Sequence, residues 1–292
     1  MKIGRKKFLA LVAVGASLSL GVRAVSAQPT TAPLAQEQVK QIVASPDRSA
    51  ADRTNDLRRK PEEMLVFIGI HPGITALDLS AAGGYTTELL ARAIGPAGIV
   101  YGQSRPRNPS QAVTPPAAPE GNSNPTVPPA AAPAAAPAGA PRPSPEALAG
   151  RDSALKSAGI KAAPITAVVL PFETPVPPGL APLDLVTLMF NYHDLGHLGV
   201  DRAAMNRAIF QALKPGGFYV IADHSGRPGT GISEAGTLHR VEEAFLRKEV
   251  EAAGFKLAAE GNFLRNPNDP RDKNTPDPPQ PKDEFVLKFV KP

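Results

Sequence analysis

The sequence of 292 residues contains no cysteine and no tryptophan, and aromatic residues make up only 5% of it. Without cysteine the chain can form neither disulfide bonds nor thiolate metal sites. The absence also fits an oxidising compartment, where free thiols are a liability. Long apolar runs are scarce as well. The stretch at residues 8–22 is 15 residues long, which is shorter than the ~20 residues that a membrane-spanning helix needs.

The N-terminus has the three parts of a secretory signal. Residues 8–22 are apolar, Val25-Ser26-Ala27 offers a small-residue cleavage site, and the positive charges ahead of them are Lys2, Arg5, Lys6 and Lys7. We therefore predict a signal peptide at residues 1–27 and export to the periplasm of a bacterium. The alternative is that the stretch is retained as an N-terminal anchor. After removal of the signal we expect no membrane span.

Acidic and basic residues balance once that segment is set aside. Residues 1–27 hold five Lys or Arg and no Asp or Glu, so the formal net charge of +5 falls to zero in the remainder. A neutral chain lacks the electrostatic footprint that binds nucleic acid or an anionic membrane. We expect neither partner, and the composition leaves the oligomeric state open.

Proline and glycine, with 34 and 25 residues, are concentrated in one internal segment. Residues 104–144 consist mostly of Pro, Ala, Ser, Asn and Gly without apolar periodicity, a composition that favours disorder. Alternating strand and helix patterns resume after it. We therefore predict one domain, formed by residues 28–103 and 145–292, that a disordered Pro/Ala-rich insertion interrupts.

Short β-rich runs alternate with helical patterns on both sides of the predicted insertion. Such alternation is typical of an α/β fold with a parallel sheet covered on both faces. A long helix is expected at residues 234–253, and earlier helices at residues 34–43 and 50–67, with a new start at Pro61. The expected strands lie at residues 74–79, 99–103, 165–170, 183–190, 218–222, 255–264 and 284–290.

The segment at residues 75–85 is the most informative for function. It reads TALDLSAAGGY, so that a strand containing Asp78 is followed by a loop of small residues that opens a helix. In open parallel sheets, ligands bind beyond the carboxyl ends of the strands. A first strand-to-helix turn without bulky side chains therefore predicts a ligand site at this edge of the sheet.

This segment resembles the first motif of class I S-adenosylmethionine-dependent methyltransferases, in which an acidic residue precedes a glycine-rich turn that the cofactor approaches. Asp78 and Gly84 match the motif, whereas Ser80 and Ala82 stand where the family usually has glycine. A second match is LKPGG at residues 213–217, which resembles the turn between the family's fourth helix and fifth strand. Its proline stops a helix, and its glycines permit a sharp reversal.

The strand-end residues 191–194 and 223–224, together with residues 238–240 on the expected final helix, extend the resemblance to a group of predicted exported methyltransferases. The resemblance implies a Rossmann-like, mostly parallel seven-stranded sheet with helices on both faces and an antiparallel C-terminal strand. It also implies S-adenosyl-L-methionine as the cofactor. The cofactor-binding residues would be Asp78, Ser80, Ala82, Gly83, Gly84 and Gln103. Gln103 stands where typical members carry a carboxylate for the ribose hydroxyls, and an amide would bond them without charge assistance.

Histidines follow the expected fourth and fifth strands. His193, followed by Asp194, could act as a general base, and His224 has a similar position. The simpler interpretation of His193 is a loop histidine that Asp194 hydrogen-bonds. We predict His193, Asp194 and His224 as catalytic residues. For His239, on the expected final helix, packing or capping is the simpler role. The three imidazoles with Asp194 or Asp223 would make a credible metal ligand set. Their separations in the sequence show no compact ligand spacing, so no metal ligands are predicted.

Together these residues predict a methyltransferase that acts on an unidentified small molecule. Methyl transfer from a sulfonium needs in-line placement of donor and acceptor more than acid–base help. The alternative is an exported, non-catalytic protein that keeps the fold and binds another ligand, because fold does not determine function. A nicotinamide dehydrogenase is disfavoured, because its motif needs glycine where Ser80 and Ala82 stand and an acidic residue after the second strand.

Overall fold

The computed structural model of the chain describes residue 1 and residues 32–106, 144–180, 182–274, 276 and 280–292. Apart from residue 1, the predicted signal peptide at residues 1–27 lies outside the described residues, as does all of the predicted insertion except its ends. The strands are β1 (Thr75–Leu79), β2 (Ile99–Ser104), β3 (Ile165–Val169), β4 (Leu183–Met189), β5 (Leu213–His224), β6 (Lys256–Gly261) and β7 (Glu284–Val290). The helices are α1 (Gln36–Val43), α2 (Ala50–Arg59), α3 (Pro61–Ile68), α4 (Tyr85–Ile94), α5 (Ser144–Ser157), α6 (Tyr192–His197), α7 (Arg202–Ala212) and α8 (Glu243–Glu251).

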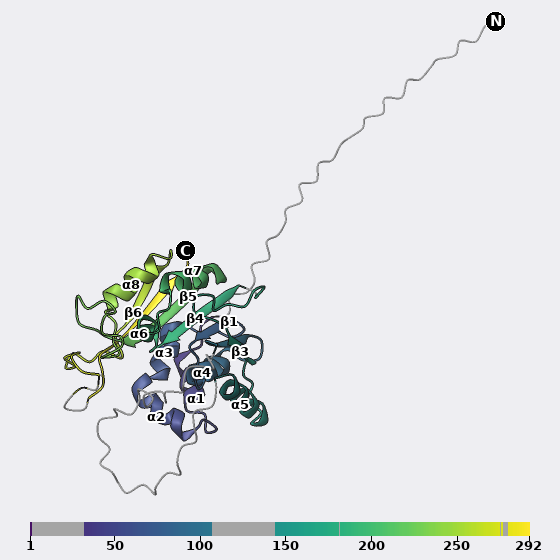
Figure 1. Cartoon of the computed structure of the whole chain (residues 1–292). Coiled ribbons are helices and arrows are strands. Elements are labelled where there is room, and N and C mark those ends of the chain that lie inside the picture. The colour runs from purple at the N-terminus through teal and green to yellow at the C-terminus, as the bar shows by residue number, and fades with distance from the viewer. Residues whose placement is uncertain (2–31, 107–143, 181, 275, 277–279) are drawn as a thin grey trace. The chain divides into compact units, whose positions relative to one another are not determined.

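The seven strands form one sheet in the order β3-β2-β1-β4-β5-β7-β6 (Figure 1). Neighbours from β3 to β5 are parallel, and β7 is antiparallel to both β5 and β6. The predicted fold class is therefore confirmed. From β1 the chain builds outward to β2 and β3 on one side and to β4 and β5 on the other. The strand order thus reverses between β1 and β4, where open α/β sheets bind their ligands.

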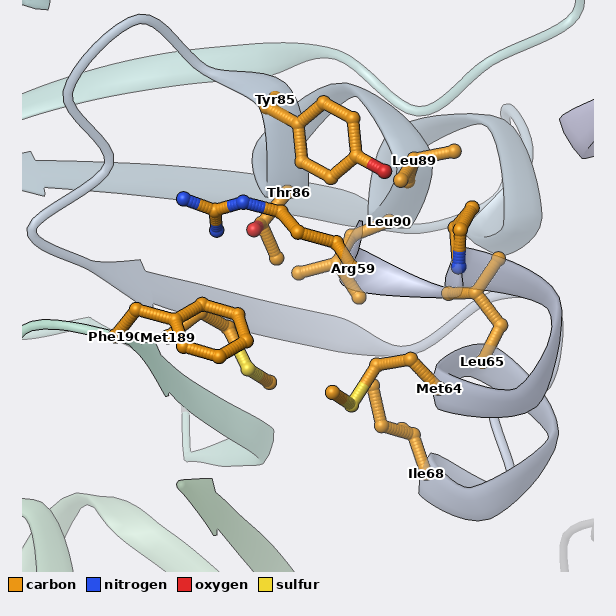
Figure 2. A pocket seen from close by; sticks show the side chains of 11 residues that line it. Arg59, Met64, Leu65, Ile68, Tyr85, Thr86, Leu89, Leu90, Met189 and Phe190 are labelled. Carbon is orange, nitrogen blue, oxygen red and sulfur yellow. The ribbon is translucent and has the colours of Figure 1, made fainter. Parts of the chain in front are cut away.

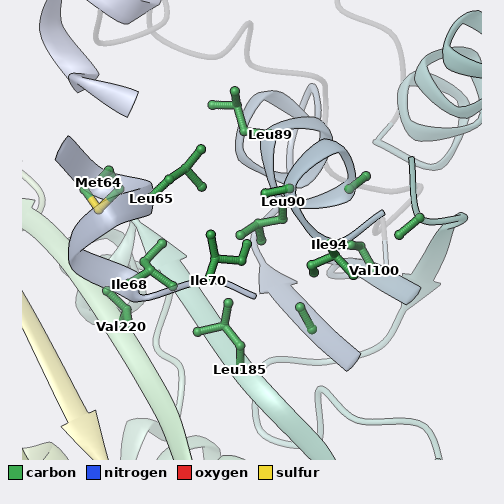
Figure 3. Close-up of a cluster of buried hydrophobic side chains, with 14 of the residues drawn as sticks. Met64, Leu65, Ile68, Ile70, Leu89, Leu90, Ile94, Val100, Leu185 and Val220 are labelled. Atoms are coloured by element: carbon green, nitrogen blue, oxygen red, sulfur yellow. The ribbon is translucent and has the colours of Figure 1, made fainter. Parts of the chain in front are cut away.

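Alternate residues of each strand face opposite sides of the sheet, as the two-residue period of a strand requires. On one side Ala76, Leu185 and Val220 belong to a core that α1, α3, α4 and α5 complete. Figure 3 shows part of this core, with α3 and α4 packed over the strands. On the other side Leu77 and Val186 belong to a second core that α6, α7 and α8 complete. Helices cover both faces, as predicted.

Local sequence signals place several element boundaries. Pro61 occupies the first turn of α3, and Lys60 before it adopts a left-handed φ of 44° that separates α3 from α2. The LKPGG run lies at the start of β5, directly after α7 ends. There Gly216, at a φ of 78°, donates its N–H to Lys291 at 2.8 Å. The predicted reversal between helix and strand is therefore tied to the end of the chain.

The long helix expected at residues 234–253 is present only in its second half, as α8 (Glu243–Glu251). Residues 231–238 form turns, and helix begins only at Glu243. Between them His239 adopts a left-handed φ of 51°, and Val241 pairs with Ser225 at the end of β5. This pairing, and the buried ion pair of Arg240 with Asp269 at 2.8 Å, stop the helix. Both contacts are non-local, so helical periodicity alone could not reveal them.

No helix among the described residues combines the length and the apolar character needed to cross a membrane.

Candidate functional site

A cleft with a cavity volume of about 580 Å³ lies at the carboxyl ends of β1, β2 and β4. Its size is within the range of ~300–1,000 Å³ that small-molecule sites occupy. It coincides with the reversal of strand order, as expected for an open parallel sheet. Its walls include Ser80, Ala82, Ser104, Arg105, Phe172 and Asn191. The first strand-to-helix turn therefore borders a real cavity.

The loop after β1 keeps a glycine-like backbone although two of its residues carry side chains. Ser80 and Ala82 have φ values of 54° and 46°, and Gly84 has 79°. The left-handed region costs a residue with a side chain roughly 1–2 kcal/mol. The Ser80 and Ala82 side chains line the cleft and leave its volume open. The two departures from the family motif therefore add side chains to the lining of the cleft, while the backbone of the loop keeps the conformation that glycine residues would adopt.

Helix α5 holds this loop in place through Arg151. The guanidinium of Arg151 donates to the carbonyl of Gly83 at 2.5 Å and forms ion pairs with Asp52 (2.8 Å) and Glu88 (2.5 Å). Gly84 lies so close to α5 that a Cβ there would be 2.7 Å from Leu148. A side chain at Gly84 would therefore have to displace the Leu148 and Arg151 side chains and adopt a left-handed φ, which favours glycine at this motif position.

Asp78 lies below the loop and does not line the cleft. Its carboxylate accepts hydrogen bonds from the hydroxyls of Thr87 on α4 (2.6 Å) and Thr187 on β4 (2.8 Å). Burial raises the pKa of Asp78 to about 6, against the lowering effect of these two hydroxyls. The Asp78 carboxylate therefore links β1 to α4 and β4 through these two hydrogen bonds. A direct contact with a cofactor stays a prediction.

Gln103 is fully buried at the end of β2 and supports the loop from below. Its amide oxygen accepts the backbone N–H of Ser80 at 3.1 Å, and its amide nitrogen donates to the carbonyl of Leu170 at 2.6 Å. The predicted bond to ribose hydroxyls stays a prediction, and the structure uses both ends of the amide within the protein. The next residues, Ser104 and Arg105, do line the cleft, and sequence reasoning did not select them.

A second, smaller cavity lies between α3, α4 and the end of β4, and Figure 2 shows its lining. Its volume is about 20 Å³, enough for a single water. Arg59 lies across it between the rings of Phe190 and Tyr85, at 4.6 and 5.4 Å from their centroids. Burial and the neighbouring Arg58 lower the pKa of Arg59 to about 10. This apolar cavity is therefore a small void between packed elements, and the Arg59 side chain covers it.

The predicted catalytic residues gather at the same edge of the sheet. His193, in the first turn of α6, is fully buried, and its Nδ1 lies 2.6 Å from Asp223 at the end of β5. Asp223 also accepts the backbone N–H groups of His193 at 2.8 Å and His224 at 2.7 Å. Asp194 Oδ1 lies 3.3 Å from Nε2 of His193. Asp194 is partly exposed, so it is the member of this group that solvent reaches.

The rings of His224 and His239 pack against the ring of His193. The His224 ring lies 5.4 Å from the His193 ring, and its Nδ1 is 2.9 Å from Glu284, which also pairs with Arg58. The His239 ring lies 5.6 Å from the His193 ring. Sequence reasoning selected neither Asp223 nor Glu284. Asp223 carries a visible signal, an acid next to a histidine at a strand end, whereas Glu284 is adjacent only because β7 pairs with β5.

No family model matches the chain, and no curated protein matches it. Solved structures do. A chain of the complex between the Haloferax volcanii Trm112 methyltransferase activator and a candidate methyltransferase matches with a TM-score of 0.50 and 16% identity, over 89% of this chain and 99% of that one. A SAM dependent methyltransferase from Aquifex aeolicus matches with a TM-score of 0.49 and 15% identity, over 89% and 100%. CrArsM, an arsenic(III) S-adenosylmethionine methyltransferase from Chlamydomonas reinhardtii, matches with a TM-score of 0.49 and 14% identity, over 86% and 72%.

The chain has the Rossmann-like methyltransferase fold. The likeness to the Haloferax structure and the strand order both show it. At such low identity the likeness concerns the fold and leaves the activity to the site itself.

Backbone strain in this methyltransferase fold is concentrated around the site. Among the described residues, six that are not glycine have positive φ, and four of them lie at the carboxyl edge of the sheet or beside it. Strained backbone persists where the surrounding structure enforces it, and it clusters at functional sites. The four are Ser80 and Ala82 on the cleft, Phe190 after β4, and His239 beside His193. This distribution marks the carboxyl edge as the functional face.

Proposed function

We propose that the protein is an S-adenosylmethionine-dependent methyltransferase that acts on a small molecule. The observation that carries the proposal is the cleft at the β1–β4 switch, whose first loop keeps glycine-like φ values at Ser80 and Ala82. A cavity of about 580 Å³ suits a cofactor of nucleoside size together with a small acceptor. Retained strain without a ligand to accommodate would be hard to explain.

The residues of the cleft divide into two groups. The backbone of the loop at residues 80–84 would lie against the adenosyl part, and the hydroxyls of Ser80 and Ser104 and the guanidinium of Arg105 would offer hydrogen bonds to its polar atoms. Phe172, which follows β3, and Asn191, which follows β4, line the cleft and would face the acceptor. The cofactor supplies an activated methyl group when bound. The chain's own contribution is to hold the acceptor in line with it and to exclude water.

The acceptor's proton must leave as the new bond to the methyl carbon forms. Asp194 is a partly exposed carboxylate beside the cleft, since Asn191, which lines the cleft, donates to its Oδ2 at 2.7 Å. His193 has no exposed surface and therefore acts through Asp194, as a positioning residue. The proposal therefore assigns the proton-accepting role to Asp194 and a positioning role to His193, and the predicted catalytic role of His224 remains part of it.

Isothermal titration with S-adenosylmethionine tests the proposal. The wild-type chain should bind one equivalent, and Ala82→Leu should weaken binding at least ~10-fold, about 1.4 kcal/mol, because the larger side chain fills the cleft. Ala258→Leu, on the exposed face of the edge strand β6, is the matched control and should bind like wild type. Absence of heat at millimolar cofactor would overturn the proposal.

That negative result would favour the second candidate, a non-catalytic protein that binds another ligand in the same cleft. The side chains of Ser80 and Ala82 at two glycine positions favour this candidate, since each narrows the approach to the backbone. Export through the predicted signal at residues 1–27 belongs to both candidates as a proposal. Mass spectrometry of the protein secreted by its host would test it, with a mature N-terminus at Gln28 as the expected result.

A further inference from the structure

Three potential metal ligands converge beside the cleft. The Oδ1 atom of Asp194 lies 3.3 Å from Nε2 of His193 and 3.4 Å from Nδ1 of His239. All three atoms lie within 4.8 Å of one another. Nitrogen and oxygen ligands bind Zn²⁺ at 2.0–2.2 Å, so neighbouring ligands of a tetrahedral ion are about 3.3–3.6 Å apart. Both distances to Asp194 match the edge of such a tetrahedron.

The proton on His193 lies on the side away from this group. An ionised carboxylate only accepts hydrogen bonds, and Asp223 already accepts the backbone N–H groups of His193 and His224. Nδ1 of His193 therefore donates to Asp223 across 2.6 Å. In the neutral ring the Nε2 lone pair then faces Asp194. A histidine that donates to a carboxylate with one nitrogen and presents the other is the usual arrangement of a metal ligand and its orienting partner.

The strained backbone at His239 brings the third ligand to the group. His239 has a φ of 51°, and the segment that follows is fixed to the end of β5. Val241 donates its N–H to the carbonyl of His224 at 3.1 Å, and the buried Arg240 donates to the carbonyl of Ser225 at 3.0 Å. Strain of this kind is maintained only where the surroundings enforce it. Its effect here is to turn the His239 ring toward Asp194.

The three potential ligands, His193, Asp194 and His239, differ in their exposure to solvent. The His193 side chain is fully buried, while those of Asp194 and His239 are 31% and 27% exposed. Asn191 holds Asp194 by a 2.7 Å hydrogen bond and also lines the cleft. An ion bound by three protein ligands here would keep a further coordination position, as catalytic metal sites do.

We propose that His193, Asp194 and His239 form a binding site for a divalent transition-metal ion of the zinc type. Two imidazoles and one carboxylate suit Zn²⁺ and Fe²⁺ better than Mg²⁺ or Ca²⁺, which prefer all-oxygen ligand sets. The open position would take water or a heteroatom of a small ligand from the adjoining cleft. The site shares His193 and Asp194 with the proposed proton transfer. It includes no residue of the loop after β1, so metal binding can be measured separately from binding of S-adenosylmethionine.

The test is a Zn²⁺ titration of the untagged full-length chain after chelator treatment, without S-adenosylmethionine. The wild-type chain should bind one Zn²⁺ and retain it through gel filtration, with Mg²⁺ failing to compete. His239→Asn keeps a residue that tolerates left-handed φ, and Asp194→Asn keeps the contact with Asn191. Each should weaken binding by more than the ~10–100-fold that loss of an outer-shell partner costs.

Two further variants separate a metal site from surface binding. Asp223→Asn should weaken Zn²⁺ binding by about 10–100-fold through the orientation of His193. His197→Asn removes an exposed histidine of the same helix that is outside the group, and its Zn²⁺ affinity should equal that of wild type. Circular dichroism of each metal-free variant checks that it is folded. The proposal is overturned if folded wild type binds less than one Zn²⁺, or if His239→Asn binds as tightly as wild type.

Discussion

Burial decides the chemistry of Asp78 at the scale of a single residue. The motif suggests a residue that faces the cofactor, yet its carboxylate is enclosed by β1, α4 and β4 and bonded to two threonine hydroxyls. Burial disfavours the charged form and raises the pKa of Asp78 from 3.8 to about 6. The structural consequence is a carboxylate that titrates within an ordinary working range of pH.

This raised pKa makes the stability of the protein depend on pH in a defined direction. A carboxyl group whose pKa is higher in the folded state stabilises the fold below pH ~4 and loses that contribution as the pH rises through about 6. The asparagine of Asp78→Asn does not titrate, so the variant does not undergo this loss of stability. From pH 4 to pH 7 the free energy of unfolding of the variant relative to wild type should therefore increase by up to ~3 kcal/mol. Urea denaturation at both pH values measures it.

The same measurement on Glu37→Gln, at an exposed position of α1, gives the background for the comparison. Parallel pH profiles for wild type and Asp78→Asn would contradict the assignment of a raised pKa to Asp78.

The loop after β1 is the element on which the cofactor site depends, and its strain can be measured. Ser80→Gly and Ala82→Gly each relieve left-handed backbone, worth roughly 1–2 kcal/mol, against ~0.4–1 kcal/mol of added unfolded-state entropy. Each variant should therefore be about 0.5–1 kcal/mol more stable than wild type in urea denaturation. Both should bind S-adenosylmethionine at least as tightly as wild type, because the cleft widens.

Ala81 provides the matched control within the same loop. Its φ is not positive, so Ala81→Gly adds entropy to the unfolded chain without relieving strain and should destabilise the protein. If all three glycine variants changed stability in the same direction, strain at Ser80 and Ala82 would be excluded.

Elements whose signals are local could be predicted from the sequence, and elements set by distant contacts could not. The seven strands and the boundary at Pro61 follow from apolar runs and helix-stop residues, and all are present. The first half of the helix expected at residues 234–253 is absent because Arg240 pairs with Asp269 and Val241 with Ser225. The same non-local turn places His239 beside Asp194. The sequence offers His239 as a candidate ligand, but it does not show that the two side chains meet.

At the scale of the whole molecule, the sheet explains why residues far apart in sequence share one site. The parallel strands β1, β2, β4 and β5 all end at the same edge, which collects the loop after β1, the end of β2 and the histidine group. The α/β alternation predicted this edge. The sequence could not predict which side chains line the cleft, because that depends on the turn geometry of the loop and on the packing of α5 against it.

The central claim is that the loop at residues 80–84 borders a cleft that seats an adenosyl ligand. A crystal structure of the full chain grown with S-adenosylhomocysteine, the demethylated product, tests it most directly. We predict electron density for the ligand in the cleft at the carboxyl ends of β1, β2 and β4, in contact with Ser80 and Ala82, whose φ values stay positive. Density for the ligand elsewhere, or Ser80 and Ala82 side chains closing the cleft at saturating ligand, would contradict the claim.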